Sequence, residues 1–235
     1  MTDMTPSPET TTEPTTVGDA MAPLMERLKA RGVDPTPAPA APEPRGESQE
    51  EAQERRQRRL SAYAARWREK VPAMYQEASV DDLDDLQHAA HVRGWLRSGS
   101  LHLVLAGPVG TGKTHAAYAV GNQALAAGLW VEAWAVGDLM DALRPGGSDH
   151  GAEERARKCH VLVLDDLVGK ATDWEAERMT LLLDARVRDQ RQTVVTTNIT
   201  SGQITETWGG RFMDRLRYRL TPLTFQGESR RGAEW

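Results

Sequence analysis

The fold is decided by one stretch of sequence, Leu101-His102-Leu103-Val104-Leu105-Ala106-Gly107-Pro108-Val109-Gly110-Thr111-Gly112-Lys113-Thr114. Its first six residues are mostly apolar and predict a buried strand over 101–106. The next eight fit the pattern G-x-x-x-x-G-K-[ST], and a helix is expected over 115–127. A strand, a glycine-rich loop and a helix in this order predict a phosphate-binding loop.

The residue types of this loop suit a nucleoside triphosphate. Gly107, Gly110 and Gly112 allow successive backbone N–H groups to turn towards a phosphate, where the helix N-terminus adds partial positive charge. We expect Lys113 to reach the β- and γ-phosphates of ATP and the Thr114 hydroxyl to hold Mg²⁺. The alternative is a glycine-rich turn that binds nothing, and the intact order of strand, loop and helix disfavours it.

The composition excludes several classes of protein. The 235 residues suffice for one domain of ordinary size with extensions. No apolar run approaches the roughly 20 residues of a membrane span, and the N-terminus has no signal-peptide pattern. The one cysteine, Cys159, rules out an internal disulfide and a Cys-cluster zinc site, and we expect it to be a buried, inert thiol. We therefore expect a cytoplasmic protein that makes no contact with a membrane.

Residues 1–50 differ from the rest of the chain. They carry nine of the thirteen prolines, and their nine acidic and four basic side chains account for the whole net charge of −5. This acidic, Pro- and Thr-rich tail has too little apolar surface to offset the entropy of ordering, so we expect it to be largely disordered. A short amphipathic helix is expected over about 19–31. Whether that helix folds against a partner or forms only transiently stays open.

Residues 51–79 are expected to form a charged helical linker. Its helix is predicted over 50–70 and buries one narrow stripe, formed by Leu60, Tyr63, Ala64 and Trp67. Its arginines suit nucleic acid or solvent, and the glutamates beside them favour a solvated face.

Strands and helices alternate after residue 80. Strands are expected over 101–106, 129–136, 161–164, 193–197 and 220–225. Helices are expected over 81–97, 115–127, 137–143, 153–158, 174–190 and 208–218. This alternation predicts an α/β domain with a parallel sheet over residues 80–235.

Two carboxylates and an amide follow strands of the predicted sheet. In phosphate-loop ATPases the first carboxylate at such a strand end holds Mg²⁺ and the second polarises the attacking water, which assigns these roles to Asp165 and Asp166. The alternative, a pair of turn aspartates, is disfavoured because ionised pairs at the end of a buried strand are costly without a cation. Asp166 has a shorter arm than the commoner glutamate, so we expect slow turnover. Asn198 is expected to orient water or to sense phosphate loss, with a turn-forming role as the alternative.

A basic cluster lies on the last predicted helix, within Arg211–Arg217. An arginine supplied in trans stabilises charge on a γ-phosphate and can raise turnover by several orders of magnitude. The alternative is a surface helix in which Asp214 pairs with Arg211 or Arg217. The residues alone leave both interpretations open.

Together these motifs resemble the AAA+ ATPases of the DnaC type, the bacterial and phage helicase loaders, with the related IstB transposition ATPases. The resemblance covers about residues 81–231. It rests on Gly-Pro-Val-Gly-Thr-Gly-Lys-Thr, Val-Leu-Val-Leu-Asp-Asp, Thr-Thr-Asn and Gly-Gly-Arg-Phe-Met-Asp-Arg-Leu. It implies that Arg215 is an arginine finger acting in trans, that Arg231 is a second sensor of the nucleotide, and that the fold lacks a C-terminal helical lid. The zinc ligands that some relatives carry near the N-terminus are missing here.

The resemblance implies an ATP-dependent loader that forms a homo-oligomer in the ATP state, holds single-stranded DNA and delivers a hexameric replicative helicase. The tail helix would dock on that helicase. The alternative function is an IstB-like ATPase that regulates DNA transposition, and the disordered tail favours the loader. A nucleotide-independent adaptor is disfavoured by the intact Lys113, Thr114 and Asp165. The candidates for DNA contact are Arg144, Arg155, Arg157 and Lys158, with solvated surface as the alternative.

Overall fold

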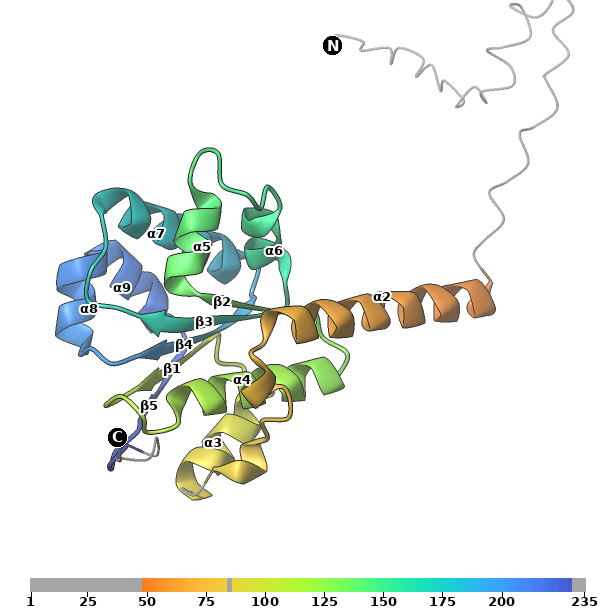
Figure 1. Ribbon diagram of the computed structural model, residues 1–235, viewed down its shortest axis with the longest axis horizontal. Helices are drawn as coiled ribbons and strands as arrows, with labels where there is room; N and C mark the ends of the chain where they lie inside the picture. Colours follow the sequence, from red (N-terminus) through yellow and green to blue (C-terminus); the bar gives the residue numbers. More distant parts are fainter. Residues whose placement is uncertain (1–47, 84–85, 230–235) are drawn as a thin grey trace, which may run out of the picture. The chain divides into compact units, whose positions relative to one another are not determined.

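The computed structural model describes residues 48–83 and 86–229 (Figure 1). Its helices are α2 (Gln49–Lys70), η1 (Ala73–Tyr75), η2 (Val80–Asp82), α3 (Leu86–Trp95), α4 (Lys113–Ala126), α5 (Val136–Leu143), α6 (Ala152–Lys158), α7 (Asp173–Arg188), α8 (Ser201–Trp208) and α9 (Gly210–Arg217). Its strands are β1 (His102–Ala106), β2 (Val131–Ala135), β3 (Val161–Leu167), β4 (Gln192–Thr197) and β5 (Leu220–Thr224). The tail helix expected over 19–31 and the expected sensor Arg231 lie outside the described residues.

The five strands form one parallel sheet in the order β2-β3-β4-β1-β5, which confirms the predicted α/β class. β1 lies between β4 and β5, with Leu103 opposite Val194 on one side and Thr221 on the other. The carboxyl ends of parallel strands share one edge of a sheet, so the segments that follow β1, β3 and β4 are brought together there. No helix follows β5 in the described residues 225–229.

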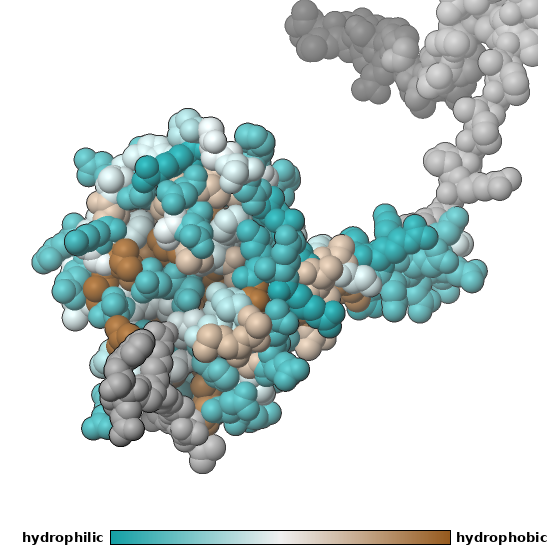
Figure 2. Space-filling model, in the orientation of Figure 1, coloured by the Kyte–Doolittle hydropathy of each residue, from teal (hydrophilic) through white to brown (hydrophobic). Residues whose placement is uncertain are grey.

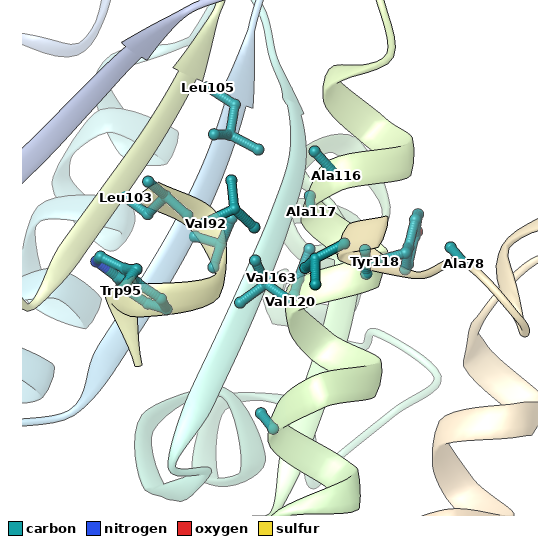
Figure 3. Close-up of a cluster of buried hydrophobic side chains, with 14 of the residues drawn as sticks. Ala78, Val92, Trp95, Leu103, Leu105, Ala116, Ala117, Tyr118, Val120 and Val163 are labelled. Atoms are coloured by element: carbon teal, nitrogen blue, oxygen red, sulfur yellow. The ribbon is translucent and has the colours of Figure 1, made fainter. Parts of the chain in front are cut away.

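The two faces of the sheet carry separate apolar cores. Successive side chains of a strand point to opposite faces, so Leu103 and Leu105 enter one core while Val104 enters the other. The first core is completed by α3, α4 and the end of α2, and Figure 3 shows Val92 of α3 beside Leu103. The second core is completed by α5 to α9, which lie on the other side of the sheet in Figure 1.

The end of α2 is anchored to the body of the domain. Trp67 packs against Gly121 so closely that a Cβ there would meet the indole at 2.2 Å, and its Nε1–H donates to Asn122 Oδ1 over 2.6 Å. Tyr63 stacks on Trp130 with ring centroids 5.6 Å apart. The predicted apolar stripe of this helix is therefore confirmed. The earlier turns of α2 are exposed, and Figure 2 shows them as hydrophilic.

Two predicted helices differ from the structure. The helix expected over 208–218 is found as α9, and α8 before it was not expected; Gly209, with a φ of +86°, ends α8 and separates the two. α8 has no continuous apolar stripe that would predict it, and it begins with a capping box at Thr200.

The helix expected over 81–97 is split into η2 and α3, because a capping box at Ser79 starts a separate short turn. Ala90 is exposed, while Val92 and Trp95 are buried. Among the helices of the described residues, none is long and apolar enough to cross a membrane.

Candidate functional site

The loop after β1 has the predicted arrangement between strand and helix. Gly107 has a φ of +145°, and a Cβ on it would lie 2.2 Å from the carbonyl oxygen of Phe225. Gly110 has a φ of +85°, and a Cβ there would lie 2.0 Å from Ser229 Oγ. Only glycine fits both the left-handed backbone and these close approaches. The chain after β5 therefore lies directly on the loop.

Lys113 is the first residue of α4 and is buried, with 8% of its surface exposed. Its Nζ donates to the carbonyl oxygen of Pro108 over 2.6 Å. The Thr111 hydroxyl donates to the same oxygen over 2.9 Å. These bonds hold the loop around a buried ammonium group, which is the cation that this site offers to a phosphate.

The first carboxylate after the apolar part of β3 is bound to the loop helix. Asp165 Oδ1 accepts hydrogen bonds from the Thr114 hydroxyl over 3.0 Å and from the Thr196 hydroxyl over 2.6 Å. The Asp166 N–H donates to Thr196 Oγ1 over 2.8 Å. The Asp165 carboxylate is thereby held against the start of α4, and the hydroxyl oxygen of Thr114 lies beside it.

Asp166 occupies a strained position in the same strand. Its φ is +60°, and the pairing of β3 with β4 shifts between Leu164 and Leu167. An irregularity of this kind re-aims a side chain at a sheet edge. The Asp166 side chain is exposed and lines the cavity described next.

A cavity of about 870 Å³ lies over the loop, within the range of roughly 300–1,000 Å³ that is usual for small-molecule and cofactor sites. It brings together residues from three of the predicted motifs and from other segments of the chain. Its lining includes Val109, Gly110, Thr111, Gly112, Lys113, Thr114, Asp165, Asp166, Thr196, Thr197, Asn198, Thr224, Phe225 and Gln226. Asn198 is exposed and directly follows β4, as expected.

A further wall of the cavity, the aromatic wall, contains Tyr75 and His88. Met74 and Leu83 lie in the same lining, together with the polar Asp82 and His115. Tyr75 stacks on Tyr118 with ring centroids 5.0 Å apart, and His88 stacks on Phe225 with centroids 4.6 Å apart. Aromatic side chains beside the phosphate loop suit contact with a planar ring such as a nucleobase. No sequence motif pointed to the aromatic wall, because its residues meet only when η1 and α3 pack beside the loop.

Comparison with known proteins gives the family. The family of IstB-like ATP binding proteins matches residues 48–234. The chain belongs to this family.

Among curated relatives of this IstB-like ATP-binding protein, the replicative helicase loader DnaC of Escherichia coli (strain K12) is 31% identical over 121 residues. That alignment covers 48% of this chain and 49% of DnaC. The uncharacterized protein YdaV of the same strain is 31% identical over 137 residues, covering 56% of this chain and 55% of YdaV. The chain thus spans about half the length of these relatives. The crystal structure of DnaI has a TM-score of 0.60 at 23% identity, covering 68% of this chain and 94% of that one, and it supports the AAA+ phosphate-loop fold.

Arg215 of the IstB-like chain lies on α9 and is not among the residues that line the described cavity. Its Nε donates to Asp184 Oδ1 on α7, and its Nη1 pairs with Asp214 Oδ2 at 3.0 Å. The hydrogen bond to Asp184 is the main cause that raises the pKa of Arg215 above its ordinary value. The pairing of Asp214 with Arg211 or Arg217 that one interpretation expected is replaced by this pair.

The four candidates for DNA contact all have acidic partners. Arg155 is 16% exposed and pairs with Glu132 and Asp149. The others form the pairs Arg144–Glu175, Arg157–Glu153 and Lys158–Glu154. Each of these cations therefore has an acidic partner within the chain, as a solvated or structural role requires, and DNA contact by them stays a prediction.

The segment after Asp166 is held by α8. Trp208 Nε1–H donates to the Val168 carbonyl over 2.9 Å, and the Thr207 hydroxyl donates to the Gly169 carbonyl over 3.2 Å. α8 thus contacts the segment that follows β3, and α9, which carries Arg215, comes directly after α8 in the chain.

Cys159 is buried as expected, and burial raises the pKa of its thiol. Its sulfur accepts a hydrogen bond from the buried Arg186 over 3.3 Å. A buried thiol with a raised pKa is a poor nucleophile, which agrees with a structural role.

Proposed function

We propose that this chain is an ATP-dependent loader of a replicative DNA helicase onto single-stranded DNA during replication initiation. One observation carries the proposal: the Lys113 loop is bonded to Asp165 through Thr114 beneath a cavity, in a chain 31% identical to the helicase loader DnaC over 121 residues. The loop and carboxylate form an ATP site, and the relative's named activity supplies the biological role.

In this proposal the loop from Gly107 to Thr114 binds the triphosphate with its backbone N–H groups, and the Lys113 ammonium exchanges the Pro108 carbonyl for the β- and γ-phosphates. Thr114 Oγ1 and Asp165 Oδ1 lie 3.0 Å apart, and such paired oxygen ligands fit Mg²⁺, which prefers oxygen. Bound there, Mg²⁺ would neutralise charge that develops on the phosphates. The aromatic wall at Tyr75 would receive the base.

Hydrolysis would use the two groups beside the triphosphate. Asp166 orients and polarises the attacking water, and Asn198 orients that water or senses loss of the γ-phosphate. The short Asp166 side chain, at a backbone φ of +60°, supports slow turnover.

The site would be completed by a second copy of the chain. Arg215 is absent from the lining of its own described cavity, so its charge would act on the γ-phosphate bound by a neighbour. ATP would thereby favour a homo-oligomer that holds single-stranded DNA in the cytoplasm. The tail, including the helix expected over 19–31, would dock on the hexameric helicase.

The alternative function is an IstB-like ATPase that regulates DNA transposition, and the match to the IstB-like family over residues 48–234 favours keeping it. Both functions use the same ATP site, so the partner decides between them.

A pull-down of the full-length chain against the replicative helicase and against an IstB-type transposase, with and without ATP, tests the proposal. We expect retention of the helicase, and loss of that retention when residues 1–35 are deleted. ATP-dependent retention of the transposase alone would replace the loader by the alternative. The Lys113→Ala chain is the control for the dependence on nucleotide.

A further inference from the structure

Asp184 connects the helix of Arg215 to a different part of the fold. It lies on α7, and its carboxylate accepts the Nε–H of Arg215 on α9. The Asp184 side chain is 30% exposed and that of Arg215 is 41% exposed, so the pair sits at the surface. It lies outside the core that α9 forms with Phe212, Met213 and Leu216.

The second partner of Arg215 is of a different kind. Asp214 is the adjacent residue on the same helix, and its side chain is 74% exposed. Its bond to Arg215 lies within α9 and so does not link the guanidinium to another element of the fold. Asp184 belongs to α7, which packs on the sheet through Met179 and Leu183. The bond to Asp184 therefore ties the guanidinium to a rigid frame.

One nitrogen of the Arg215 guanidinium takes no part in the bonds to Asp184 and Asp214. Nε bonds to Asp184 and Nη1 to Asp214, while Nη2 takes part in neither bond. A guanidinium is a planar fork, so fixing two of its nitrogens sets the direction of the third. A long side chain held in one orientation loses less freedom when it meets a phosphate.

We propose that Asp184 is a positioning residue for Arg215, holding its guanidinium from behind so that the Nη2 end is presented to the ATP of a neighbouring subunit. This inference rests on the proposed role of Arg215 in trans. It adds a residue that touches neither the nucleotide nor the cavity: Asp184 would act only on turnover that depends on assembly, and it would act from the subunit that donates the arginine.

The test uses the full-length chain and compares Asp184→Asn with Asp189→Asn. Asp189 caps the same helix, is exposed, and pairs with Arg188, so its variant removes an equal charge nearby. We expect Asp184→Asn to lower the hydrolysis rate per assembled subunit by roughly ten- to hundredfold, with ATP affinity unchanged. Asp189→Asn should keep the wild-type rate, and Asp184→Glu should recover part of the loss.

A mixing experiment separates positioning from folding. The Asp166→Asn chain keeps a normal Arg215–Asp184 pair but lacks its own water-polarising carboxylate, and Asn tolerates the positive φ at that position. Its addition to Asp184→Asn chains should restore hydrolysis at their intact phosphate loops. Failure to restore it at any ratio would assign Asp184 a structural role and overturn the inference.

Two other outcomes also count against it. A wild-type or faster rate for Asp184→Asn, with Arg215→Ala inactive, would overturn the positioning role and leave the arginine in place. A wild-type rate for Arg215→Ala would overturn the trans arginine of the proposed function, and this inference with it.

Discussion

The two faces of the sheet contain different kinds of polar group. The face with α3 and α4 carries the phosphate loop, and its polar residues bond to one another around a cavity, as Thr114 does with Asp165. The face with α5 to α9 carries Arg215, which bonds to acids at the surface and is not among the lining residues of the described cavity. The first face therefore has the residues of a nucleotide site within a single chain. The second face carries the guanidinium of Arg215 at the surface of the protein.

The difference also appears in how each group is held. Lys113 is 8% exposed and is fixed by the loop that it serves. The Arg215 side chain is 41% exposed and is fixed by a neighbouring helix. This contrast supports the proposal that Lys113 acts on the nucleotide of its own chain and that Arg215 acts on the nucleotide of a neighbour.

The largest expected effect is a difference in ATP binding and hydrolysis between a variant of the first face and a variant of the second. Lys113→Ala should weaken ATP binding and lower hydrolysis by at least about 100-fold, because it removes the cation within the cavity. Arg215→Ala should keep ATP binding and lose only the hydrolysis that assembly stimulates. Nucleotide titration by fluorescence and phosphate release at increasing chain concentration measure the two effects.

Mixing the variants provides the control. Arg215→Ala chains have intact loops, and Asp166→Asn chains have intact arginines, so a mixture should regain part of the wild-type rate. If Arg215→Ala weakened ATP binding of the isolated chain as much as Lys113→Ala does, the contrast between the two faces would be false.

Much of the first face was predictable, because its chemistry is local in sequence. The loop and Lys113 lie within eight residues, and Asp165 follows a short, valine-rich apolar run that favours a buried strand. Thr196 was missed because its contact with Asp165 exists only through the register of β3 and β4, which pairs Leu164 with Val195. The aromatic wall was missed because His88 and Phe225, which stand far apart in the sequence, meet only after folding.

The second face was harder to predict for a physical reason. α8 has few apolar residues, and its end depends on the backbone of Gly209 rather than on a pattern of side chains. Asp184 looked like any other acid of an amphipathic helix. Its pairing with Arg215 is set by how α7 and α9 cross, which single-sequence periodicity does not encode.

The next prediction concerns how the free energy of unfolding depends on pH, and it involves a histidine of the sheet between the two faces. His102 is fully buried in β1, and neither ring nitrogen has a hydrogen-bond partner among the described residues. Burial, and then the charge of Arg186, lower its pKa from 6.5 to about 4. Since the unfolded chain binds the proton more readily, the stability due to the neutral histidine is present above pH 6.5 and is lost as the pH falls from 6.5 towards 4.

We therefore expect the free energy of unfolding to fall by about 2 kcal/mol between pH 7 and pH 5 from this group. His102→Leu should remove that part of the pH dependence, as measured by urea unfolding at both values. His160, which is exposed and whose ring accepts the Trp130 N–H over 2.9 Å, provides the comparison for a histidine with a hydrogen-bond partner. An unchanged pH slope in His102→Leu would show that other groups titrate in this window.

The smallest expected effect tests the connection between the second face and the carboxylate end of β3. Trp208→Phe keeps an aromatic ring but removes the N–H that bonds to Val168. Trp95→Phe, on the first face, removes an N–H that has no partner among the described residues. Both variants lose similar volume, so the difference between them isolates the hydrogen bond, and Trp208→Phe should be less stable by about 1 kcal/mol.

The ATP hydrolysis rates of the same two variants test whether the bond from Trp208 also affects function. If the bond from Trp208 steadies the segment after Asp166, hydrolysis should fall severalfold in Trp208→Phe and stay near wild type in Trp95→Phe, at matched ATP saturation. Equal turnover in the two variants, with the stability difference intact, would mean that α8 stabilises the fold without acting on the carboxylates. The two faces would then cooperate only between chains, through Arg215, and not within one.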